Sequence, residues 1–174
     1  MNAVTPVVLG LLTKQPLSGY DIKAIVDRST RFFWAASYGQ IYPELRRLEA
    51  DGLIDGEDRP NGGRTRRVYR LTDAGRDELV AWLFGSTVTI ELRDESLLRL
   101  FFADVLPHEQ ALMLLEGRKR GHEEFLDVLH AIDARPGTDT PFTDLVLRWG
   151  IAFNEWGAKW CEEQLERLRT EKAA

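Results

Sequence analysis

The sequence predicts a mostly α-helical protein with one small β-hairpin, divided into two domains. Apolar residues recur at helical spacing through most of the 174 residues. The exception is a pair of short strand-like runs that flank a segment rich in Gly, Pro, Asn and Asp. A break at residues 85–91 separates this first part from a second part whose pattern is helical throughout. We therefore predict a first domain over residues 1–84 and an all-helical second domain over residues 92–174.

Two short helices are expected to open the first domain. Thr5 is the predicted N-cap of the first helix, with Pro6 at its first position, and the helix should stop before Pro16. Ser18 can cap the second helix, whose apolar residues recur at helical spacing. Residues 31–36 form an aromatic connector to the next helix.

A third helix is predicted to begin at Ser37. Ser37 and Gln40 fit a capping box, in which each side chain bonds the backbone amide of the other residue. Three apolar residues at i, i+4 and i+7 form the expected buried stripe: Ile41, Leu45 and Leu48. Gly52 is expected to end the helix, because glycine readily takes up the left-handed conformation found there.

The opposite face of this helix is suited to a close approach to another backbone. Its residues are polar, small or flat: Gly39, Gln40, Pro43, Arg46 and Arg47, with Tyr42 on one flank. Gln and Arg with such neighbours are what a helix needs to enter a DNA major groove. The predicted DNA contacts of the helix are Ser37, Tyr38, Gln40, Tyr42, Arg46 and Arg47. The alternatives are a solvated polar face and, for Tyr42, packing on the flank of the helix.

The two strand-like runs, residues 53–57 and 66–71, predict a β-hairpin whose tip is the turn-rich segment 58–65. Thr72 is then expected to cap a fourth helix. The resulting order, three helices followed by a hairpin and another helix, is that of a winged helix-turn-helix domain.

Charge is distributed unevenly along the chain, whose formal net charge is −5. Residues 1–80 carry 12 Lys and Arg against 11 Asp and Glu, whereas residues 81–174 carry 11 against 17. The segment 59–76 holds six arginines and one acidic residue, which favours a polyanionic partner. Within it, Arg64 and Arg66 are predicted beside the hairpin tip, where an arginine can enter an A·T-rich minor groove. A solvated loop is the alternative.

Three helices are expected in the second domain. An apolar helix that includes Phe101 and Phe102 should end at Pro107, a long helix covers about residues 107–133, and the last covers about 142–169. The last helix carries an apolar stripe at spacings of 4, 4, 3 and 4: Leu145, Trp149, Phe153, Trp156 and Trp160. Two helices of one chain cannot easily cover so long a stripe, so we predict a homodimer formed through it.

Part of this aromatic surface could instead line a pocket for a flat aromatic effector. The candidate effector-binding residues are Phe101, Phe102, His122, Trp149 and Trp156. The two uses are compatible, because a pocket can form at a subunit interface. His122 could bond a ligand or respond to pH, and the alternative is an ordinary interface histidine. For Cys161, redox sensing and simple packing are the two alternatives.

Catalysis, metals and cofactors are not expected. The candidate ligands show none of the spacings of a metal site: His108, His122, His130 and Cys161. Neither a nucleophile elbow nor a phosphate-binding loop is present. One cysteine permits no internal disulfide, which favours a reducing compartment and a cytoplasmic protein. No apolar run approaches the roughly 20 residues that a membrane-spanning helix needs.

Three motifs, in order along the first domain, resemble those of PadR-like transcriptional regulators. They are the segments 17–22 (Leu-Ser-Gly-Tyr-Asp-Ile), 38–54 (from Tyr-Gly-Gln-Ile-Tyr-Pro to Asp-Gly-Leu-Ile) and 67–76 (Arg-Val-Tyr-Arg-Leu-Thr-Asp-Ala-Gly-Arg). The acidic helical part is similar to the C-terminal dimerisation domain of the longer members. The resemblance implies that residues 37–48 form the recognition helix and residues 58–66 the wing.

The resemblance further implies a homodimeric repressor that binds a pseudo-palindromic, double-stranded DNA operator. Members of this family often control detoxification, efflux or phenolic-acid stress genes, and some leave DNA when a small aromatic compound binds. No ligand motif in the second domain identifies an effector for this chain. The alternative function is a winged-helix adaptor that binds protein without binding DNA. The clustered arginines of the hairpin favour DNA.

Overall fold

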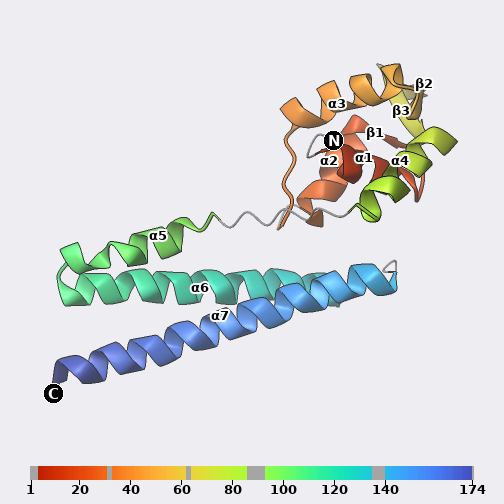
Figure 1. Ribbon diagram of the computed structural model, residues 1–174. Helices are drawn as coiled ribbons and strands as arrows, with labels where there is room; N and C mark the ends of the chain where they lie inside the picture. The colour runs from red at the N-terminus through yellow and green to blue at the C-terminus, as the bar shows by residue number, and fades with distance from the viewer. Residues whose placement is uncertain (1–3, 31–32, 62–63, 86–92, 135–139, 174) are drawn as a thin grey trace. The chain divides into compact units, whose positions relative to one another are not determined.

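The computed structural model describes residues 4–30, 33–61, 64–85, 93–134 and 140–173. These residues form helices and one three-stranded antiparallel sheet, in two compact units, residues 1–90 and 91–174 (Figure 1). The predicted fold class, mostly helical with a small β-hairpin, is confirmed.

The described part of the first unit contains the predicted order of three helices, a hairpin and a fourth helix. Its elements are α1 (Thr5–Leu12), β1 (Leu17–Ser18), α2 (Gly19–Asp27), α3 (Tyr38–Ala50), β2 (Ile54–Asn61), β3 (Arg64–Leu71) and α4 (Asp73–Leu83). The two-residue strand β1 was not predicted. It pairs with β3, with Leu17 opposite Tyr69, and is too short to give a periodic pattern.

The predicted cap of α1 is wrong. Val4 occupies the N-cap position, and no side chain caps the helix, which begins at Thr5 with Pro6 in its first turn. The Thr5 side chain is buried instead, and its hydroxyl donates to the carboxylate of Glu44, 39 residues away. The position of Thr5 next to Pro6 suggested a local capping bond, but the Thr5 hydroxyl bonds a residue that is distant in the sequence.

The predicted ends of α3 are confirmed. Ser37 is the N-cap, and its backbone N–H and hydroxyl donate to Gln40 Oε1 at 2.9 and 3.0 Å. After the helix, Gly52 has φ +71°, in the left-handed region that favours glycine. The amide of Gly52 donates to Glu49 O and that of Leu53 donates to Leu48 O, so two carbonyl oxygens of the last turn are satisfied.

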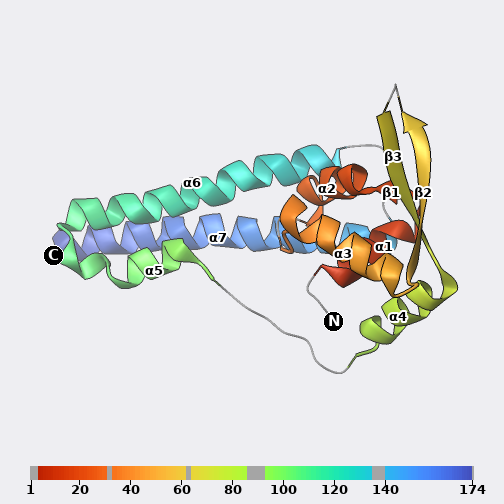
Figure 2. The same cartoon turned by 90° about the horizontal axis from the view of Figure 1, so that it is seen from above.

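The hairpin is longer than predicted. β2 and β3 pair in register from Ile54 opposite Leu71 to Asn61 opposite Arg64, so only Gly62 and Gly63, outside the described residues, separate the strands. The two strands form a ribbon that projects beyond the helices of their unit (Figure 2). Residues 58–65 were predicted as a loop because they are polar, but a ribbon exposed on both faces needs no apolar residues. Asp58 lies opposite Arg67 and pairs with it at 2.9 Å, which supports the polar part of the ladder.

The core of the first unit lies between α1, α2, α3 and the base of the sheet. Its fully buried side chains include the predicted stripe of α3 and apolar residues from each of the other elements: Val8, Leu9, Ile22, Val26, Ile41, Leu45, Leu48 and Ile54. Burial of one face of α3 leaves its other face exposed.

The described residues of the second unit are all helical or irregular. They form α5 (Glu95–Phe101), the short 3₁₀ helix η2 (Ala103–Val105), α6 (His108–Asp133) and α7 (Pro141–Ala173). α6 and α7 lie antiparallel along each other, and α5 packs against α6 (Figure 1). Four buried side chains pack together in the contact between α6 and α7: Leu112, Leu115, Cys161 and Leu165.

Two details of the second unit differ from the prediction. Phe102 caps α5 and the chain then turns into η2, so the apolar helix ends earlier than expected. α7 extends over 33 residues, beyond both predicted ends. Most of the predicted break at 85–91 and most of the segment between the two long predicted helices lie outside the described residues, as do Arg31 and Phe32 of the connector.

Candidate nucleic-acid interface

The exposed face of α3 carries the residues that the sequence places there. Tyr38 and Tyr42 are both nearly half exposed, and their rings stack 6.1 Å apart along the helix. The ammonium group of Lys23 lies 5.4 Å from the centre of the Tyr38 ring, a cation–π contact from α2. The remaining predicted contacts are exposed as well: Ser37, Gln40, Arg46 and Arg47. The face is therefore accessible to a partner.

The N-terminal part of this face is preorganised by the cap. Because Gln40 Oε1 accepts two hydrogen bonds from Ser37, the Gln40 side chain is held back against the start of the helix. Gln40 can therefore offer a partner its amide N–H groups more readily than its oxygen.

Arg46 and Arg47 are adjacent but differ in their surroundings. Arg46 is exposed, and its guanidinium makes no hydrogen bond or ion pair with any described residue. Arg47 instead bonds Glu44 through Nε and Nη2 at 3.1 and 2.7 Å, and Asp51 through Nη1 at 2.6 Å. These acidic partners, with the hydrogen bond to Glu44 first among the causes, raise the pKa of Arg47 above its ordinary value.

Glu44 was not among the predicted site residues. It lies on α3, yet its side chain is only 2% exposed and meets both Arg47 and Thr5. The signal in the sequence was its position: Glu44 falls three residues after Ile41, within the buried stripe, where an acidic residue needs partners.

Tyr42 packs closely on the start of α2. A Cβ atom at Gly19 would lie 2.8 Å from Tyr42 Cε1 and 3.1 Å from Leu45 Cδ1, so position 19 has no room for a side chain. The tyrosine ring thus packs on a flank of the helix while part of it stays exposed. Both predicted uses of Tyr42 remain compatible with this placement.

The arginines of the hairpin are more tightly held than expected. Arg66 pairs with Asp21, whose carboxylate also accepts from the backbone N–H of Ser18 at 2.9 Å. Arg66 therefore joins β3 to the start of α2 instead of standing free beside a loop. The side chain of Arg64 lies outside the described residues, and its backbone pairs with Asn61 at the end of the ribbon.

Arg67 was not predicted as a site residue either. It bridges three elements, because its guanidinium bonds Glu49 of α3 at 2.5 Å and Asp58 of β2 at 2.9 Å. The segment 59–76 looked uniformly basic in the sequence, but its arginines meet acidic residues from elsewhere in the fold. Only the tertiary structure reveals this partial neutralisation.

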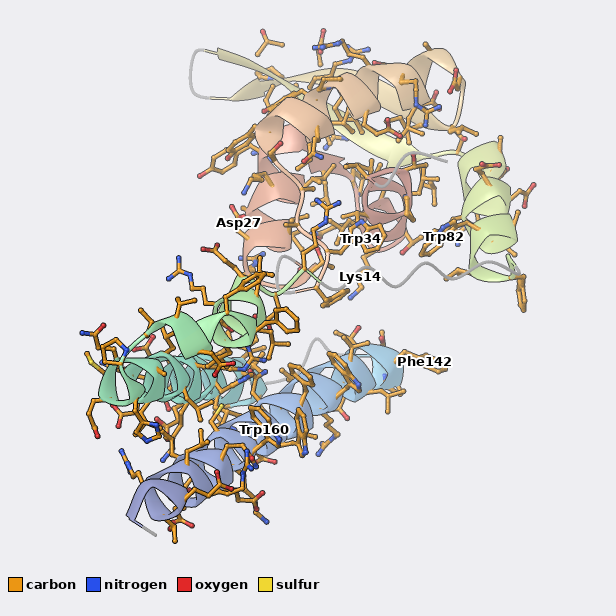
Figure 3. All side chains as sticks on the ribbon, turned by 60° about the vertical axis from the view of Figure 1, so that its left-hand side comes forward. Lys14, Asp27, Trp34, Trp82, Phe142 and Trp160 are labelled. Atoms are coloured by element: carbon orange, nitrogen blue, oxygen red, sulfur yellow. The ribbon has the colours of Figure 1, made fainter. Side chains whose placement is uncertain are left out.

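The predicted dimerisation stripe is exposed along α7. Trp149 and Trp156 are 64% and 60% exposed, and Leu145 and Phe153 are exposed too. The rings follow one another along the helix, with centre-to-centre distances of 5.4 Å for Trp149–Phe153, 6.2 Å for Phe153–Trp156 and 6.4 Å for Trp156–Trp160. Trp160 lies near the middle of α7, whereas Phe142 projects from its first turn (Figure 3).

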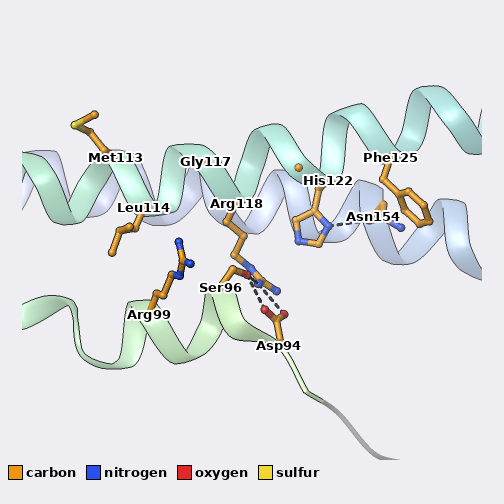
Figure 4. A pocket seen from close by; sticks show the side chains of 11 residues that line it. Asp94, Ser96, Arg99, Met113, Leu114, Gly117, Arg118, His122, Phe125 and Asn154 are labelled. Atoms are coloured by element: carbon orange, nitrogen blue, oxygen red, sulfur yellow. Dashed lines mark hydrogen bonds and ion pairs between the residues drawn. The ribbon is translucent and has the colours of Figure 1, made fainter. Parts of the chain in front are cut away.

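The structure brings the predicted effector residues together only in part. A cavity of about 510 Å³ lies between α5, α6 and α7, and His122 is the one predicted residue that lines it (Figure 4). His122 Nδ1 lies 2.8 Å from Asn154 Oδ1, while Asn154 Nδ2 donates to Gly150 O. Phe101 and Phe102 are exposed and meet edge to face at 5.1 Å, away from the lining of the cavity.

Among the residues that line this cavity, Arg118 of α6 donates to Asp94 at 2.7 Å and also bonds Ser96 (Figure 4). Burial alone would raise the pKa of Asp94, but hydrogen bonds from Ser96, Arg118 and the Leu97 amide outweigh it and lower this pKa to about 2. These contacts of Arg118 hold the start of α5 against α6.

The described ranges of the chain hold neither a metal site nor a membrane-spanning helix. Within them, no group of three or more His, Cys, Asp or Glu side chains is arranged to hold a metal ion. None of the described helices combines the length and the apolar character needed to cross a bilayer.

Comparison with known proteins accounts for both units. Residues 8–81 match the model of the transcriptional regulator PadR-like family, and residues 92–169 match that of the virulence activator alpha C-terminal domain. The negative transcriptional regulator PadR of Bacillus subtilis is 36% identical over 113 residues, 64% of this chain and 62% of that protein. The match thus spans less than two thirds of that relative's length.

Solved structures extend the match to nearly the whole chain. Bacillus subtilis PadR in complex with operator DNA has a TM-score of 0.87 and 28% identity, covering 96% of this chain and 99% of that one. The same regulator in complex with p-coumaric acid has a TM-score of 0.78 and 28% identity, covering 97% and 99%. Since the winged-helix unit and the helical unit both match in order, the chain belongs to the PadR-like family of transcriptional regulators.

Proposed function

We propose that this protein is a homodimeric repressor that binds a pseudo-palindromic operator through α3 and through the wing, defined here as β2, β3 and the two glycines between them. Two α3 helices enter successive major grooves, about one helical turn or ~34 Å apart. The observation that carries the proposal is the exposed face of α3, where Arg46 makes no hydrogen bond or ion pair with any described residue and the neighbouring side chains are flat or small. The DNA-bound relative supports it.

Each element has a distinct part in the proposed complex. Arg46 contacts a base edge or a phosphate, and Gln40 and Tyr42 approach the groove from the start and the flank of the helix. Arg64, at the end of the wing ribbon, reaches the adjacent minor groove. Ser37 and Tyr38 meet the backbone of the duplex where α3 begins. Repression follows because a bound dimer blocks access of the polymerase to the promoter.

Dimerisation is proposed through the aromatic stripe of α7. So large an exposed apolar surface is unusual for a monomer, and it gives a second copy an extended contact. Phe101, Phe102, Trp149 and Trp156 then belong to, or border, the interface. Trp160, half-buried against α6, anchors the inner end of the stripe.

A small aromatic effector is proposed to release the operator. The complex of the Bacillus subtilis relative with p-coumaric acid makes this compound the first to test. A coupling of ~1–3 kcal/mol between the effector site and the DNA site suffices for a useful switch. We further propose that the chain is not an enzyme, and that it acts in the cytoplasm, where a regulator reaches the chromosome.

Fluorescence anisotropy tests DNA binding. Labelled duplexes from upstream of the gene are titrated at about 50 and 200 mM salt, with scrambled duplex as competitor, since each phosphate contact contributes about −0.9 to the log–log salt slope. Salt-sensitive binding that resists scrambled competitor supports the proposal. Binding no stronger than that of scrambled DNA at low salt would point to the adaptor function instead.

A further inference from the structure

A buried acidic residue lies in the middle of the helix proposed to enter DNA. Glu44 is 2% exposed, although the helix α3 presents polar residues to solvent on its other face. A carboxylate in such a position costs stability unless charged and hydrogen-bonding partners meet it. Its partners therefore indicate what the position is for.

Two partners of this carboxylate come from α3 and α1. Arg47, one turn further along α3, makes a two-pronged contact: Nε lies 3.1 Å from Glu44 Oε2, and Nη2 lies 2.7 Å from Glu44 Oε1. Thr5, at the start of α1, donates its hydroxyl to Glu44 Oε1 and accepts from Arg47 Nη2 at 3.1 Å. These three side chains form a hydrogen-bonded network, named here the Glu44 clamp, that fastens α3 to α1.

The clamp leaves little positive field at Arg47. Its guanidinium faces the side chains of both Glu44 and Asp51, and these two acidic residues compete with a DNA phosphate for it. A phosphate that approached Arg47 would meet the exposed Asp51 carboxylate. Moving the guanidinium away would leave Glu44 buried without its bidentate partner, which is costly. Arg46 has no such acidic partner among the described residues and is not part of the clamp.

We propose that Arg47 is a positioning residue that fixes the recognition helix on α1 through Glu44 and Thr5, while Arg46 makes the contact with DNA. The tandem arginines thus divide the two tasks. This inference rests on the proposed DNA binding of α3, and it separates two residues that the sequence treats alike. The Glu44 clamp then sets the orientation of α3 relative to α1.

The salt dependence of operator binding distinguishes the two roles. Arg46→Gln removes a DNA contact. If that contact is to a phosphate, the log–log salt slope of operator binding becomes shallower by about 0.9. If it is to a base, affinity falls at constant slope and the sequence preference is relaxed. Arg47→Gln is expected to weaken binding by about 2- to 30-fold, the range for residues that act through a network, with the slope and the sequence preference unchanged. A shallower slope for Arg47→Gln would overturn the proposal.

Glu44→Gln is expected to change operator affinity in opposite directions under the two possible roles of Arg47. If Arg47 contacts DNA, removing its acidic partner frees the guanidinium and strengthens binding. If Arg47 positions the helix, the same change loosens α3 and weakens binding. Asp51→Asn is the matched control, because it also removes a negative charge beside Arg47 but keeps the clamp. Tighter binding by Glu44→Gln than by Asp51→Asn would contradict the proposal.

Arg47→Lys provides a second, conservative variant. Lysine keeps the charge that a phosphate contact needs, but it cannot form the bidentate pair with Glu44. We expect it to weaken operator binding nearly as much as Arg47→Gln does. Wild-type affinity in Arg47→Lys would assign the residue to a phosphate instead.

A measurement without DNA keeps the inference separate from the proposed function. In a double-mutant cycle of Glu44→Gln and Arg47→Gln, followed by chemical unfolding, the clamp predicts that the changes in the unfolding equilibrium constant are coupled by roughly tenfold or more. If the wild-type protein binds no DNA, the proposed function fails but the cycle still tests the clamp. Additive effects in the cycle would overturn the positioning role whatever the DNA result.

Discussion

Arg67 of β3 donates to Glu49 of α3, with Nη2 2.5 Å from Oε1, and this ion pair passes over Gly56 of β2. A Cβ atom at position 56 would lie 2.6 Å from Arg67 Nε and closer still to the Glu49 carboxylate. The wing is therefore joined to α3 by an ion pair that needs a glycine beneath it. The same contact, with the hydrogen bond to Glu49 as the main cause, raises the pKa of Arg67 above its ordinary value.

Gly56→Ala is expected to displace this pair and to lower the free energy of unfolding by about 1 kcal/mol, the low end of the usual cost of overfilling a site, since the flexible side chains can move aside. Urea unfolding measures the change. Gly10→Ala is the matched control, because a Cβ atom at Gly10 would meet nothing within 4 Å, and alanine in a helix stabilises by up to about 1 kcal/mol. Equal stability of Gly56→Ala and the wild type would show that the pair does not constrain position 56.

Gly19→Ala is expected to force Tyr42 away from α2 and to destabilise the first unit by about 1–3 kcal/mol, the usual cost of overfilling a packed site. Thermal unfolding gives the cost. In a Tyr42→Ala background most of it should vanish, because the nearest obstructing atoms are gone. A cost that persists undiminished in that background would place the obstruction elsewhere.

Asp94 predicts a specific loss of stability in acid. Its pKa is about 2 in the folded protein against 3.8 ordinarily, so the folded state favours the carboxylate. Asp94 therefore contributes on the order of 1–2 kcal/mol to the free energy of unfolding above about pH 4, and this contribution is lost as the pH falls towards 2. Calorimetry should therefore show Asp94→Asn less stable than the wild type at pH 6 and nearly equal at pH 2. Asp104→Asn, at an exposed position of η2, serves as the control. A deficit independent of pH would contradict the assigned pKa.

The sequence predicted local features well and tertiary partners poorly. The Ser37 cap, the buried stripe of α3 and the Gly52 terminus depend on residues within a few positions of one another, and all three are present in the structure. Thr5 also looked like a local cap, but its hydroxyl is used across 39 positions by Glu44. Nothing in the spacing along the chain carries that information.

The candidate site shows the same limit. Amphipathic periodicity predicted which face of α3 would be exposed, because burial follows directly from it. It could not separate Arg46 from Arg47, or show that Arg66 and Arg67 meet Asp21 and Glu49, since ion pairs depend on how elements pack. The two-residue strand β1 and the full length of the wing were missed for a related reason: both are defined by pairing with β3.

Trp156→Ala is expected to weaken the dimer, because it removes a large side chain, 60% exposed in the single chain, from the centre of the α7 stripe. Sedimentation velocity over a range of concentrations should show dissociation at higher protein concentration than for the wild type. Glu155→Ala, on another face of the same helix, should leave sedimentation unchanged. An identical profile for Trp156→Ala and the wild type would remove this tryptophan from the interface.

Selection from a pool of random double-stranded DNA with the full-length protein shows whether α3 and the wing of a dimer recognise operator DNA. We expect enrichment of an inverted repeat whose half-sites lie about 10 base pairs apart, centre to centre, or a multiple of that spacing. The selected duplex should bind the wild type and lose affinity or selectivity with Arg46→Gln. A pool that stays random after repeated selection at low salt would contradict the account.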